Sequence, residues 1–248
     1  MIELNKIYNE DCLEGMKRIP DKSVDMILCD LPYGTTACKW DTIIPFEPLW
    51  EQYERVIKDN GAIVLTSSQP FTSALVMSNP KMFKYSWVWD KKNPTNFVMS
   101  KKQPLKYHED VCVFYKKQCN YYPIKWKGKP NHSGGSAKFN TTEIYSAPVK
   151  NIPRDVSGLK YPRSILEFPK HASQSKLHPT QKPVALFEYL IRTYTNEGET
   201  ILDNCMGSGT TAIACLNTNR NFIGFELDET YHTVANERIA NHLTERGD

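Results

Sequence analysis

Residues 24–34 read Val24-Asp25-Met26-Ile27-Leu28-Cys29-Asp30-Leu31-Pro32-Tyr33-Gly34, an apolar run followed by an acid, a proline and an aromatic residue. The apolar run is short enough for one buried β-strand. Its carboxyl end would present a carboxylate, backbone carbonyls without ladder partners and a flat aromatic ring. In an open α/β sheet, ligands bind at this edge of the strands. The segment therefore predicts a buried strand and a binding site at its end.

The groups at this strand end suit a flat base that carries an exocyclic amine. Asp30 and the carbonyl of Leu31 can each accept one N–H of the amine, while Tyr33 stacks on the ring. Such an amine is a poor nucleophile because its lone pair is delocalised into the ring. Two fixed acceptors would support the positive charge that develops as the nitrogen attacks, an effect of roughly 3–4 kcal/mol for one well-placed group. An ordinary strand-to-turn corner is the alternative.

Strand-like and helix-like segments alternate along most of the chain. We expect strands at 6–9, 24–29, 62–66, 85–89, 110–115, 199–203 and 221–226, and helices at 11–16, 46–58, 71–77, 183–195, 210–216 and 231–242. Asp11 is a candidate N-cap, Gly61 is expected to end the second helix, and Pro183 to lie in a first turn. This alternation predicts an α/β fold with a doubly wound, mostly parallel sheet.

The alternation breaks down in residues 116–172, where lysines, tyrosines, Gly134-Gly135 and several prolines give no sustained period. This stretch is too long to be a simple connection. We therefore expect a loop-rich insert at 116–172 that interrupts a discontinuous domain formed by 1–115 and 173–248.

Length and composition narrow the class of protein. The chain has 248 residues, of which 40% are apolar and 24% charged, as is usual for a globular protein with a real core. No run approaches the roughly 18 apolar residues of a membrane span, and the amino terminus lacks the apolar segment of a signal peptide, so we expect a cytoplasmic protein. The seven scattered cysteines contain no Cys-x-x-Cys pair, which argues against disulfides and a zinc site. We expect no metal.

A second candidate site lies near the carboxyl end, between an expected strand and an expected helix. Its sequence is Asp203-Asn204-Cys205-Met206-Gly207-Ser208-Gly209-Thr210-Thr211. The two glycines permit a tight turn and a close approach of a ligand to the backbone. Glu226 ends the next strand, where a carboxylate can bind two ribose hydroxyls. The pattern indicates a nucleoside cofactor.

Two cofactors remain open on this motif alone, and a plain structural turn is a third interpretation. The segment satisfies the loose dinucleotide fingerprint, Gly-x-Gly-x-x-Ala, with Ala212 in the last position. S-adenosylmethionine fits better, because the strand end at Asp30 offers acceptors for an amine and no evident group for hydride chemistry.

Taken together, the motifs resemble those of amino-methylating DNA methyltransferases, in the β arrangement, whose catalytic motif precedes the cofactor motif. Asp30-Leu31-Pro32-Tyr33 is similar to the family's Asp-Pro-Pro-Tyr, and Asp203 to Thr211 is similar to its Asp-Pro-Phe-x-Gly-Ser-Gly-Thr-Thr. His178-Pro179-Thr180-Gln181-Lys182-Pro183 resembles the segment that opens the family's first helix near the methionine end of the cofactor. Asn9 to Leu13 resembles the family's Gly-Asp-x-Leu, whose acid approaches the cofactor adenine. Two departures are Leu31 for a proline and Asn204-Cys205 for Pro-Phe.

The resemblance implies a methyltransferase fold, S-adenosylmethionine as cofactor and transfer of its methyl group to an amine of a base flipped out of DNA. The implied catalytic residues are Asp30, Leu31, Pro32 and Tyr33. The implied cofactor-binding residues are Asp11, Asp30, Lys182, Asp203, Cys205, Gly207, Ser208, Gly209, Thr210, Thr211 and Glu226.

Within the family, an aspartate at the first motif position is associated mainly with adenine N6, so Asp30 favours adenine. The alternatives are cytosine N4, a base in RNA or a free nucleoside, a catalytically inactive DNA-binding partner subunit, and a nicotinamide oxidoreductase. A homodimer and a cognate restriction endonuclease are further expectations by analogy alone.

Positive charge gathers in one part of the sequence. Between Lys91 and Lys138 there are eleven lysines and two acids, although the whole chain carries only +3. Lysines beside exposed aromatic residues suit contact with phosphates and opened bases, although a solvated charged face is the simpler alternative. We predict that double-stranded DNA is bound by Lys91, Lys92, Lys101, Lys102, Lys125, Lys127, Lys129, Lys138, Arg154 and Arg163, with 116–172 as the target-recognition insert.

Overall fold

The computed structural model describes residues 2–35, 41–129, 158–170 and 181–247. The chain folds into two units: residues 1–122 together with 164–248, and residues 123–163. The second unit is narrower than the predicted insert, because residues 116–122 and 164–170 belong to the first unit. Among the described residues, no helix is long and apolar enough to cross a membrane.

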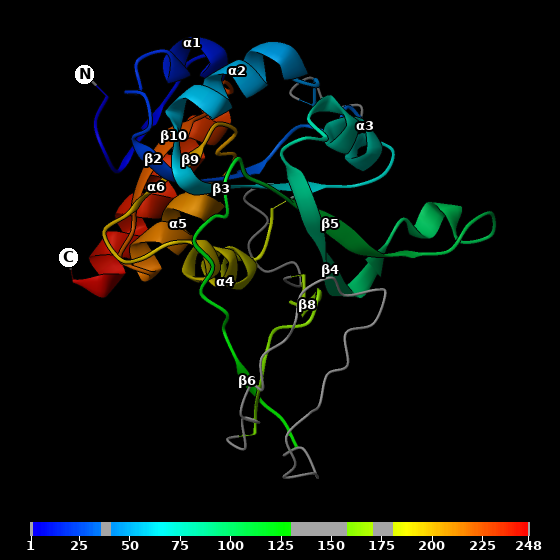
Figure 1. The fold of residues 1–248 in the computed structure, drawn as a ribbon. Helices are drawn as coiled ribbons and strands as arrows, with labels where there is room; N and C mark the ends of the chain where they lie inside the picture. The colour runs from blue at the N-terminus through cyan, green and yellow to red at the C-terminus, as the bar shows by residue number, and fades with distance from the viewer. Residues whose placement is uncertain (1, 36–40, 130–157, 171–180, 248) are drawn as a thin grey trace. The chain divides into compact units, whose positions relative to one another are not determined.

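The first unit is built on an eight-stranded sheet (Figure 1) with the order β1-β10-β9-β2-β3-β5-β4-β8. The strands are β1 (Lys6–Tyr8), β2 (Val24–Asp30), β3 (Ile57–Ser67), β4 (Phe83–Thr95), β5 (Lys106–Phe114), β8 (Ile165–Glu167), β9 (Thr200–Asp203) and β10 (Asn221–Phe225). The first five strands in this order, β1, β10, β9, β2 and β3, are mutually parallel. β5 runs antiparallel to both β3 and β4, while β8 pairs in parallel with β4. The sheet is thus mixed but mostly parallel, which confirms the predicted fold class.

Helices cover both faces of this sheet (Figure 1). They are α1 (Cys12–Met16), α2 (Phe46–Val56), α3 (Phe71–Ser78), α4 (Val184–Tyr194), α5 (Thr210–Asn217) and α6 (Glu229–Arg246). Met16, Tyr53 and Phe71 of the first three helices pack on one side, in the apolar cluster that contains Ile27 and Leu65. Leu190 of α4 and Ala212 of α5 belong to a second cluster with Leu28 and Val64. Alternate residues of β2 and β3 therefore face opposite layers, as the strand period requires.

The second unit contains a two-stranded antiparallel ribbon of β6 (Trp126–Lys127) and β7 (Leu159–Lys160). Two aromatic rings in this unit lie beside cationic side chains. The guanidinium of Arg163 lies 4.4 Å from the centre of the Trp126 ring, and the ammonium of Lys125 lies 4.6 Å from that of Tyr161.

Two features near Gly61 and Pro183 differ from the sequence prediction. Helix α2 ends at Val56, and β3 starts at the next residue, so that Gly61 lies inside the strand and does not end the helix. A side-chain carbon at Gly61 would lie 2.7 Å from the backbone oxygen of Asp25, so the glycine permits close packing of β3 on β2. Pro183 is the N-cap of α4, one residue before the predicted first turn.

The close approach at Gly61 predicts that Gly61→Ala lowers the free energy of unfolding by about 1–3 kcal/mol, because overpacking forces a backbone shift. Urea denaturation followed by circular dichroism measures this change. Asn60→Ala, at the exposed neighbouring position, is the control and should stay within about 0.5 kcal/mol of the parent. Equal stabilities of the two variants would contradict the packing argument.

Candidate functional site

A cavity of about 720 Å³ opens at the carboxyl ends of the central parallel strands. Asp30 is the last residue of β2 and Asp203 the last residue of β9. Both line this cavity together with Gly207 and Glu226. The two chemical sites expected from the sequence therefore meet in one space. Residues of β4 and β5, among them Glu109, form another part of the lining.

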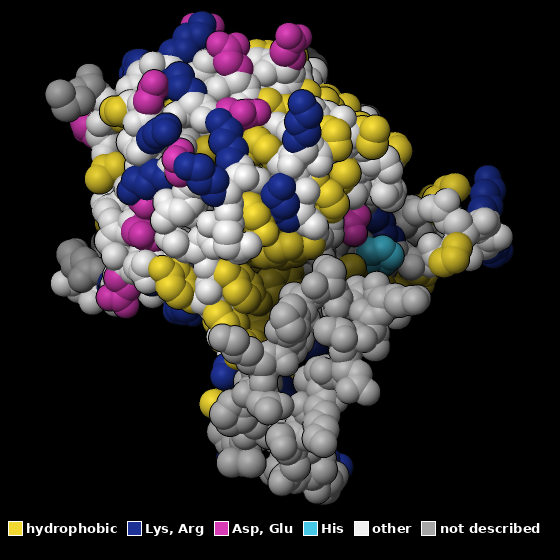
Figure 2. Space-filling view, viewed as in Figure 1, with side chains coloured by type: hydrophobic (Ala, Val, Ile, Leu, Met, Phe, Trp, Pro, Cys, Tyr) yellow, Lys and Arg dark blue, Asp and Glu magenta, His cyan; other side chains and the backbone are white. Residues whose placement is uncertain are grey.

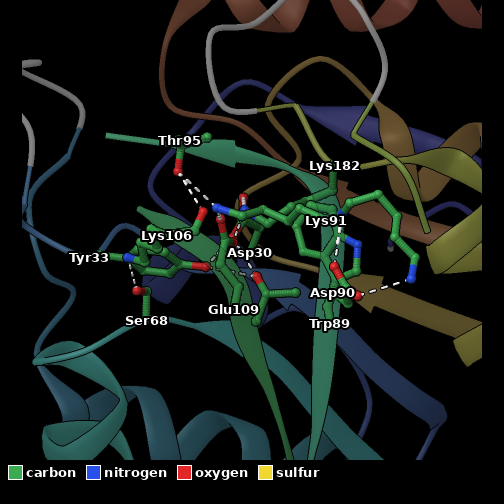
Figure 3. Close-up of polar contacts among 12 residues, drawn as sticks. Asp30, Tyr33, Ser68, Trp89, Asp90, Lys91, Thr95, Lys106, Glu109 and Lys182 are labelled. Atoms are coloured by element: carbon green, nitrogen blue, oxygen red, sulfur yellow. Dashed lines mark hydrogen bonds and ion pairs between the residues drawn. The ribbon is translucent and has the colours of Figure 1, made fainter. Parts of the chain in front are cut away.

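The carboxylate of Asp30 is fixed by three donors (Figure 3). Its Oδ1 atom accepts the hydroxyl of Tyr33 at 2.8 Å and the hydroxyl of Thr66. Its Oδ2 atom accepts the ammonium of Lys182 at 2.6 Å. Thr66 is available because Asp30 and Thr66 are partners in the parallel register of β2 and β3. The strand pairing thus positions the acid that the sequence singled out.

The turn after Asp30 is held by an acid that the sequence analysis did not single out. The backbone N–H groups of Gly34 and Thr35 donate to the two carboxylate oxygens of Asp41 at 2.8 and 2.9 Å. The ring of Tyr33 stacks on Phe71, with 5.2 Å between ring centres. Leu31, Pro32 and Tyr33 all line the cavity, so the turn presents its groups to a bound molecule.

A chain of alternating charges connects Asp30 to β4 and β5 (Figure 3). The ammonium of Lys182 lies 2.6 Å from Asp30 and 3.4 Å from Oε2 of Glu109, while Oε1 of Glu109 lies 3.4 Å from the ammonium of Lys91. Burial alone would lower the pKa of Lys182, but the two carboxylates raise it. Burial lowers the pKa of Lys91, with Glu109 opposing that shift.

Lys91 departs from its predicted role. Its side chain is only 1% exposed and is directed to Glu109 and Thr95, so it is not on a surface that a DNA phosphate reaches. The prediction used only the positive charge of Lys91, and nothing in the sequence indicates that this lysine is buried. Glu109 lines the cavity and pairs with Lys91 and Lys182. Sequence reasoning did not assign it to the site, because it counted only as one of the two acids in the basic stretch.

The cofactor end of the cavity is organised by Glu226. Its Oε2 atom accepts the backbone N–H of Gly207 at 2.7 Å, and its Oε1 atom accepts that of Asp228 at 2.9 Å. Burial raises the pKa of Glu226. Gly209 has a φ of +80° and packs against Ala235 of α6, so it permits the loop to turn into α5. The result is a carboxylate beside a tight loop and a helix amino terminus, which suits ribose hydroxyls and an anionic group.

Asp203 and Asp11 fix the backbone on either side of this cavity. Asp203 accepts the backbone N–H of Cys205 at 3.0 Å and the hydroxyl of Thr211. Burial raises the pKa of Asp203 from 3.8 to about 6. Asp11 caps α1, as predicted, by accepting from Leu13 at 2.8 Å and Glu14 at 3.2 Å.

The structure brings together nearly all the residues predicted for catalysis and cofactor binding. The catalytic set and the cofactor set line the cavity apart from Gly209, namely Asp11, Asp30, Leu31, Pro32, Tyr33, Lys182, Asp203, Cys205, Gly207, Ser208, Thr210, Thr211 and Glu226. Gly209 lies within the same loop. His178, Pro179 and Thr180 lie outside the described residues.

The predicted DNA-binding residues fall into several places. Lys101 and Lys102 are exposed in the loop between β4 and β5. Lys92 is exposed but is engaged by Asp90 at 3.1 Å and Glu167 at 2.6 Å. Lys125, Lys127, Lys129 and Arg163 are exposed residues of the second unit. Lys138 and Arg154 lie outside the described residues.

Comparison with known proteins identifies the class of enzyme. The family model described as DNA methylase, N6_N4_Mtase, matches residues 24–237, which include both strand ends of the cavity. The chain belongs to this DNA methylase family. The family comprises S-adenosylmethionine-dependent enzymes that methylate amino groups of DNA bases. The nicotinamide alternative is thereby set aside, and S-adenosylmethionine is the cofactor.

Individual relatives cover nearly the whole chain. The DNA methylase is 26% identical to the Type II methyltransferase M1.MboII of Moraxella bovis, over 95% of this chain and 96% of the relative. It is 28% identical to the DNA adenine methyltransferase YhdJ of Escherichia coli (strain K12), over 98% and 85%. The crystal structure of the M1.HpyAVI-SAM complex matches with a TM-score of 0.63 and 26% identity, over 94% of this chain and 98% of that chain. The cytosine-N4-specific PvuII DNA methyltransferase, 14% identical with a TM-score of 0.65 over 99% and 93%, shares the fold.

The raised pKa of Asp203 predicts how the stability of the DNA methylase depends on pH. Between 3.8 and about 6, the folded protein binds a proton at Asp203 that the unfolded chain has released. Stability therefore falls as the pH rises through this window, by about 3 kcal/mol for a shift of this size. Asp203→Asn keeps the shape of the side chain and cannot titrate. The free energy of unfolding of the parent minus that of Asp203→Asn should therefore be about 3 kcal/mol smaller at pH 7 than at pH 4.

Urea denaturation at a series of pH values, without cofactor, measures this difference. Glu47→Gln removes one exposed carboxylate on α2 and serves as the control for the loss of a negative charge. A parent-to-variant difference that stays constant with pH for Asp203→Asn would contradict the assignment.

Proposed function

We propose that the DNA methylase transfers the methyl group of S-adenosylmethionine directly to the N6 amine of an adenine flipped out of DNA. The observation that carries the proposal is the Asp30 carboxylate, held by Tyr33 and Thr66 in the same cavity as the Gly207 loop. An acceptor suited to the amine and a loop suited to the cofactor line the same cavity, which supports direct transfer between their ligands. The cofactor supplies an activated methyl group on a sulfonium sulfur.

Asp30 and the backbone carbonyl of Leu31 orient the amine. Each accepts one N–H, which directs the nitrogen lone pair away from the ring and stabilises the positive charge that develops on the nitrogen. Holding the amine at a fixed place turns the transfer into an effectively intramolecular step. The ring of Tyr33 stacks on the adenine, and its own hydroxyl keeps Asp30 in place. No cysteine or other covalent nucleophile is required.

Lys182 must change its partner before the base can bind in this way. Its ammonium donates a hydrogen bond to Oδ2 of Asp30 at 2.6 Å. Glu109 offers a second carboxylate 3.4 Å away from the same ammonium. In the proposed mechanism Lys182 stays paired with Glu109 while Asp30 accepts the amine.

Asp30 rather than serine at the first motif position supports adenine over cytosine. The relative named as a DNA adenine methyltransferase also supports this choice. If the test below finds N4-methylcytosine as the product, cytosine replaces adenine as the proposed substrate base. By analogy with the relatives named as Type II methyltransferases, we further propose a role beside a cognate restriction endonuclease. A cytoplasmic site of action and a homodimer stay predictions.

Contact with DNA is proposed at the loop between β4 and β5 and at the second unit. The loop follows Thr95, which lines the cavity, and carries Phe97 at 62% and Val98 at 95% exposure. Figure 2 shows apolar and cationic side chains together at the end of this hairpin. Exposed apolar side chains beside Lys101 and Lys102 suit a duplex in which one base has left the stack. In the second unit, the cations beside Trp126 and Tyr161 offer the same combination.

Replacement of Asp30 by asparagine tests the catalytic assignment. The variant keeps the volume of the side chain but removes its charge, so methyl transfer should fall by about 100- to 1,000-fold. Binding of S-adenosylmethionine should remain measurable by calorimetry, which separates chemistry from folding. Transfer is measured as incorporation of tritiated methyl groups into DNA, and mass spectrometry of the digested parent reaction identifies the methylated base.

Two outcomes would contradict the proposal. Unchanged turnover in Asp30→Asn would remove the carboxylate from the mechanism. N4-methylcytosine as the product would keep the mechanism and replace the base. Asp110→Asn is a control for a charge change on β5, where Asp110 accepts the hydroxyl of Thr72 at 2.9 Å outside the cavity.

The DNA contact predicts a change in salt dependence. Replacing Lys101 and Lys102 by alanine should lower the slope of log affinity against log salt by about 1.5–2, as expected for two lost phosphate contacts. Fluorescence anisotropy with labelled duplex DNA at several salt concentrations measures the slope. The double variant Lys81→Ala/Lys84→Ala removes the same charge at the opposite end of β4 and should leave the slope near that of the parent. Equal slopes for both double variants would move the DNA contact elsewhere.

A further inference from the structure

Two thiols line the cofactor end of the cavity and share a hydrogen-bond donor. Cys12 is the first residue of α1, and Cys205 lies in the loop after β9. The side-chain amide of Asn204 lies 3.5 Å from the sulfur of each of them. Residues far apart in the sequence thus bring two sulfur atoms to one nitrogen, at a place that small molecules reach through the cavity.

The orientation of Asn204 is fixed by a second contact. Its Oδ1 atom accepts the hydroxyl of Tyr53 at 2.5 Å, and the residue is 2% exposed. The amide N–H₂ group therefore has to face the sulfurs. A donor aimed at sulfur stabilises the thiolate, which is the reactive form of cysteine.

The thiols around this amide differ in character. A hydrogen bond from Cys205 is the main cause that lowers the pKa of Cys12, with burial opposing it and Asn204 adding to it. Burial raises the pKa of the neighbouring Cys29 to about 12. The pKa of Cys205 is raised, chiefly by its hydrogen bond with Cys12 and then by one with Cys29. Within the pair, Cys12 is therefore the thiol that ionises more readily, and Cys205 keeps its proton.

We propose that Cys12 and Cys205 form an oxidant-sensitive thiol pair, which a peroxide converts into a disulfide that blocks the binding of S-adenosylmethionine. The Cys12 thiolate attacks one peroxide oxygen, the O–O bond breaks, and a sulfenic acid and one water form. Cys205 then attacks the sulfenic sulfur, the S–O bond breaks, and a second water leaves. Overall, the two thiols lose two protons and two electrons, and hydrogen peroxide takes them up to give two molecules of water.

The pair arises from a departure in this chain. In the motif that it resembles, Pro-Phe stands where this sequence has Asn204-Cys205. The asparagine supplies the shared donor and the cysteine supplies the second sulfur. Other residues of similar size would fill the same space. Asn204 and Cys205 in addition supply the groups that the proposed redox chemistry needs.

The disulfide would act on cofactor binding through its neighbours. It would join the start of α1, next to Asp11, to the loop that leads to Gly207. Both segments line the cavity, and the N–H of Gly207 is held on Glu226 at 2.7 Å. Drawing the two segments together would narrow the space for the adenosine part of the cofactor and displace this backbone.

The experiment measures cofactor binding by the full chain, so it does not depend on which base is methylated. In a Cys38→Ser background, because Cys38 lies outside the described residues, the protein is treated with hydrogen peroxide, freed of excess oxidant and titrated with S-adenosylmethionine. Peptide mapping without reduction identifies the linked cysteines. We expect a peptide joining Cys12 to Cys205, at least about tenfold weaker binding, and recovery of affinity with dithiothreitol.

Each variant is compared with its own reduced form. Cys12→Ser and Cys205→Ser should each show the same affinity before and after peroxide, whatever that affinity is. Cys112→Ser, in which a buried thiol outside the cavity is replaced, should keep the sensitivity of the parent. Loss of binding without the Cys12–Cys205 peptide, or a loss that persists in Cys12→Ser, would overturn the proposal. Unchanged binding after the linked peptide has formed would overturn it as well.

Discussion

The parallel register of β9, β2 and β3 is the constraint on which the site depends. Met26 and Ile27 pair with Ile201 and Leu202 on one side, and Asp30 pairs with Thr66 on the other. Because parallel strands end at the same edge, this register places the carboxylate of Asp30 and the loop of Gly207 around one cavity, with the hydroxyl of Thr66 holding the carboxylate. A slip of one residue would turn Asp30 to the other face of the sheet. The apolar pattern of β2, buried on both faces, is what fixes the register.

The buried charges serve the site more than the stability of the fold. Burying Lys182 costs desolvation free energy that a pair of carboxylates offsets only in part, and such pairs are often no more stabilising than apolar residues of the same volume. Lys182 is 6% exposed and Lys91 1%, and both pair with Glu109. Lys182 and Glu109 line the cavity. A charge network of this kind leaves positive and negative groups ready to change partners when the ligand enters.

Sequence reasoning found the site where its residues follow directly from strand ends. Asp30 and Asp203 each terminate an apolar run, and the glycines after Asp203 mark a tight turn, so local patterns located both halves of the cavity. Glu109 and Asp41 could not be found in this way. Glu109 reaches the cavity because β5 pairs antiparallel with β3, and Asp41 acts on the backbone of Gly34 across a loop. Such contacts depend on tertiary placement, which periodicity does not encode.

The burial of Lys91 and the extent of β3 illustrate the same limit from another side. A lysine in a basic stretch resembles its exposed neighbours in sequence, and only the packing of β4 on β5 reveals that it is enclosed. A glycine after a helical pattern is typical of a helix end, but Gly61 lies inside β3. A glycine is needed there because the backbone oxygen of Asp25 comes too close for a side chain. In both positions a neighbour distant in sequence decides the role of the residue. Thr66, by contrast, was within reach of sequence reasoning, since it is the polar residue at the end of the apolar run 62–65.

The occupancy of Asp30 has a consequence for how the site discriminates its ligand. Both carboxylate oxygens accept hydrogen bonds from groups of the protein itself, so a base gains little by bringing a donor alone. It must replace the Lys182 ammonium on Oδ2, and the lysine must keep its charge balanced by Glu109. A base without an exocyclic amine would displace this ion pair and leave a buried carboxylate oxygen unpaired, which costs free energy. In the proposed mechanism, the ion pair between Lys182 and Asp30 therefore selects for a base with an amino group.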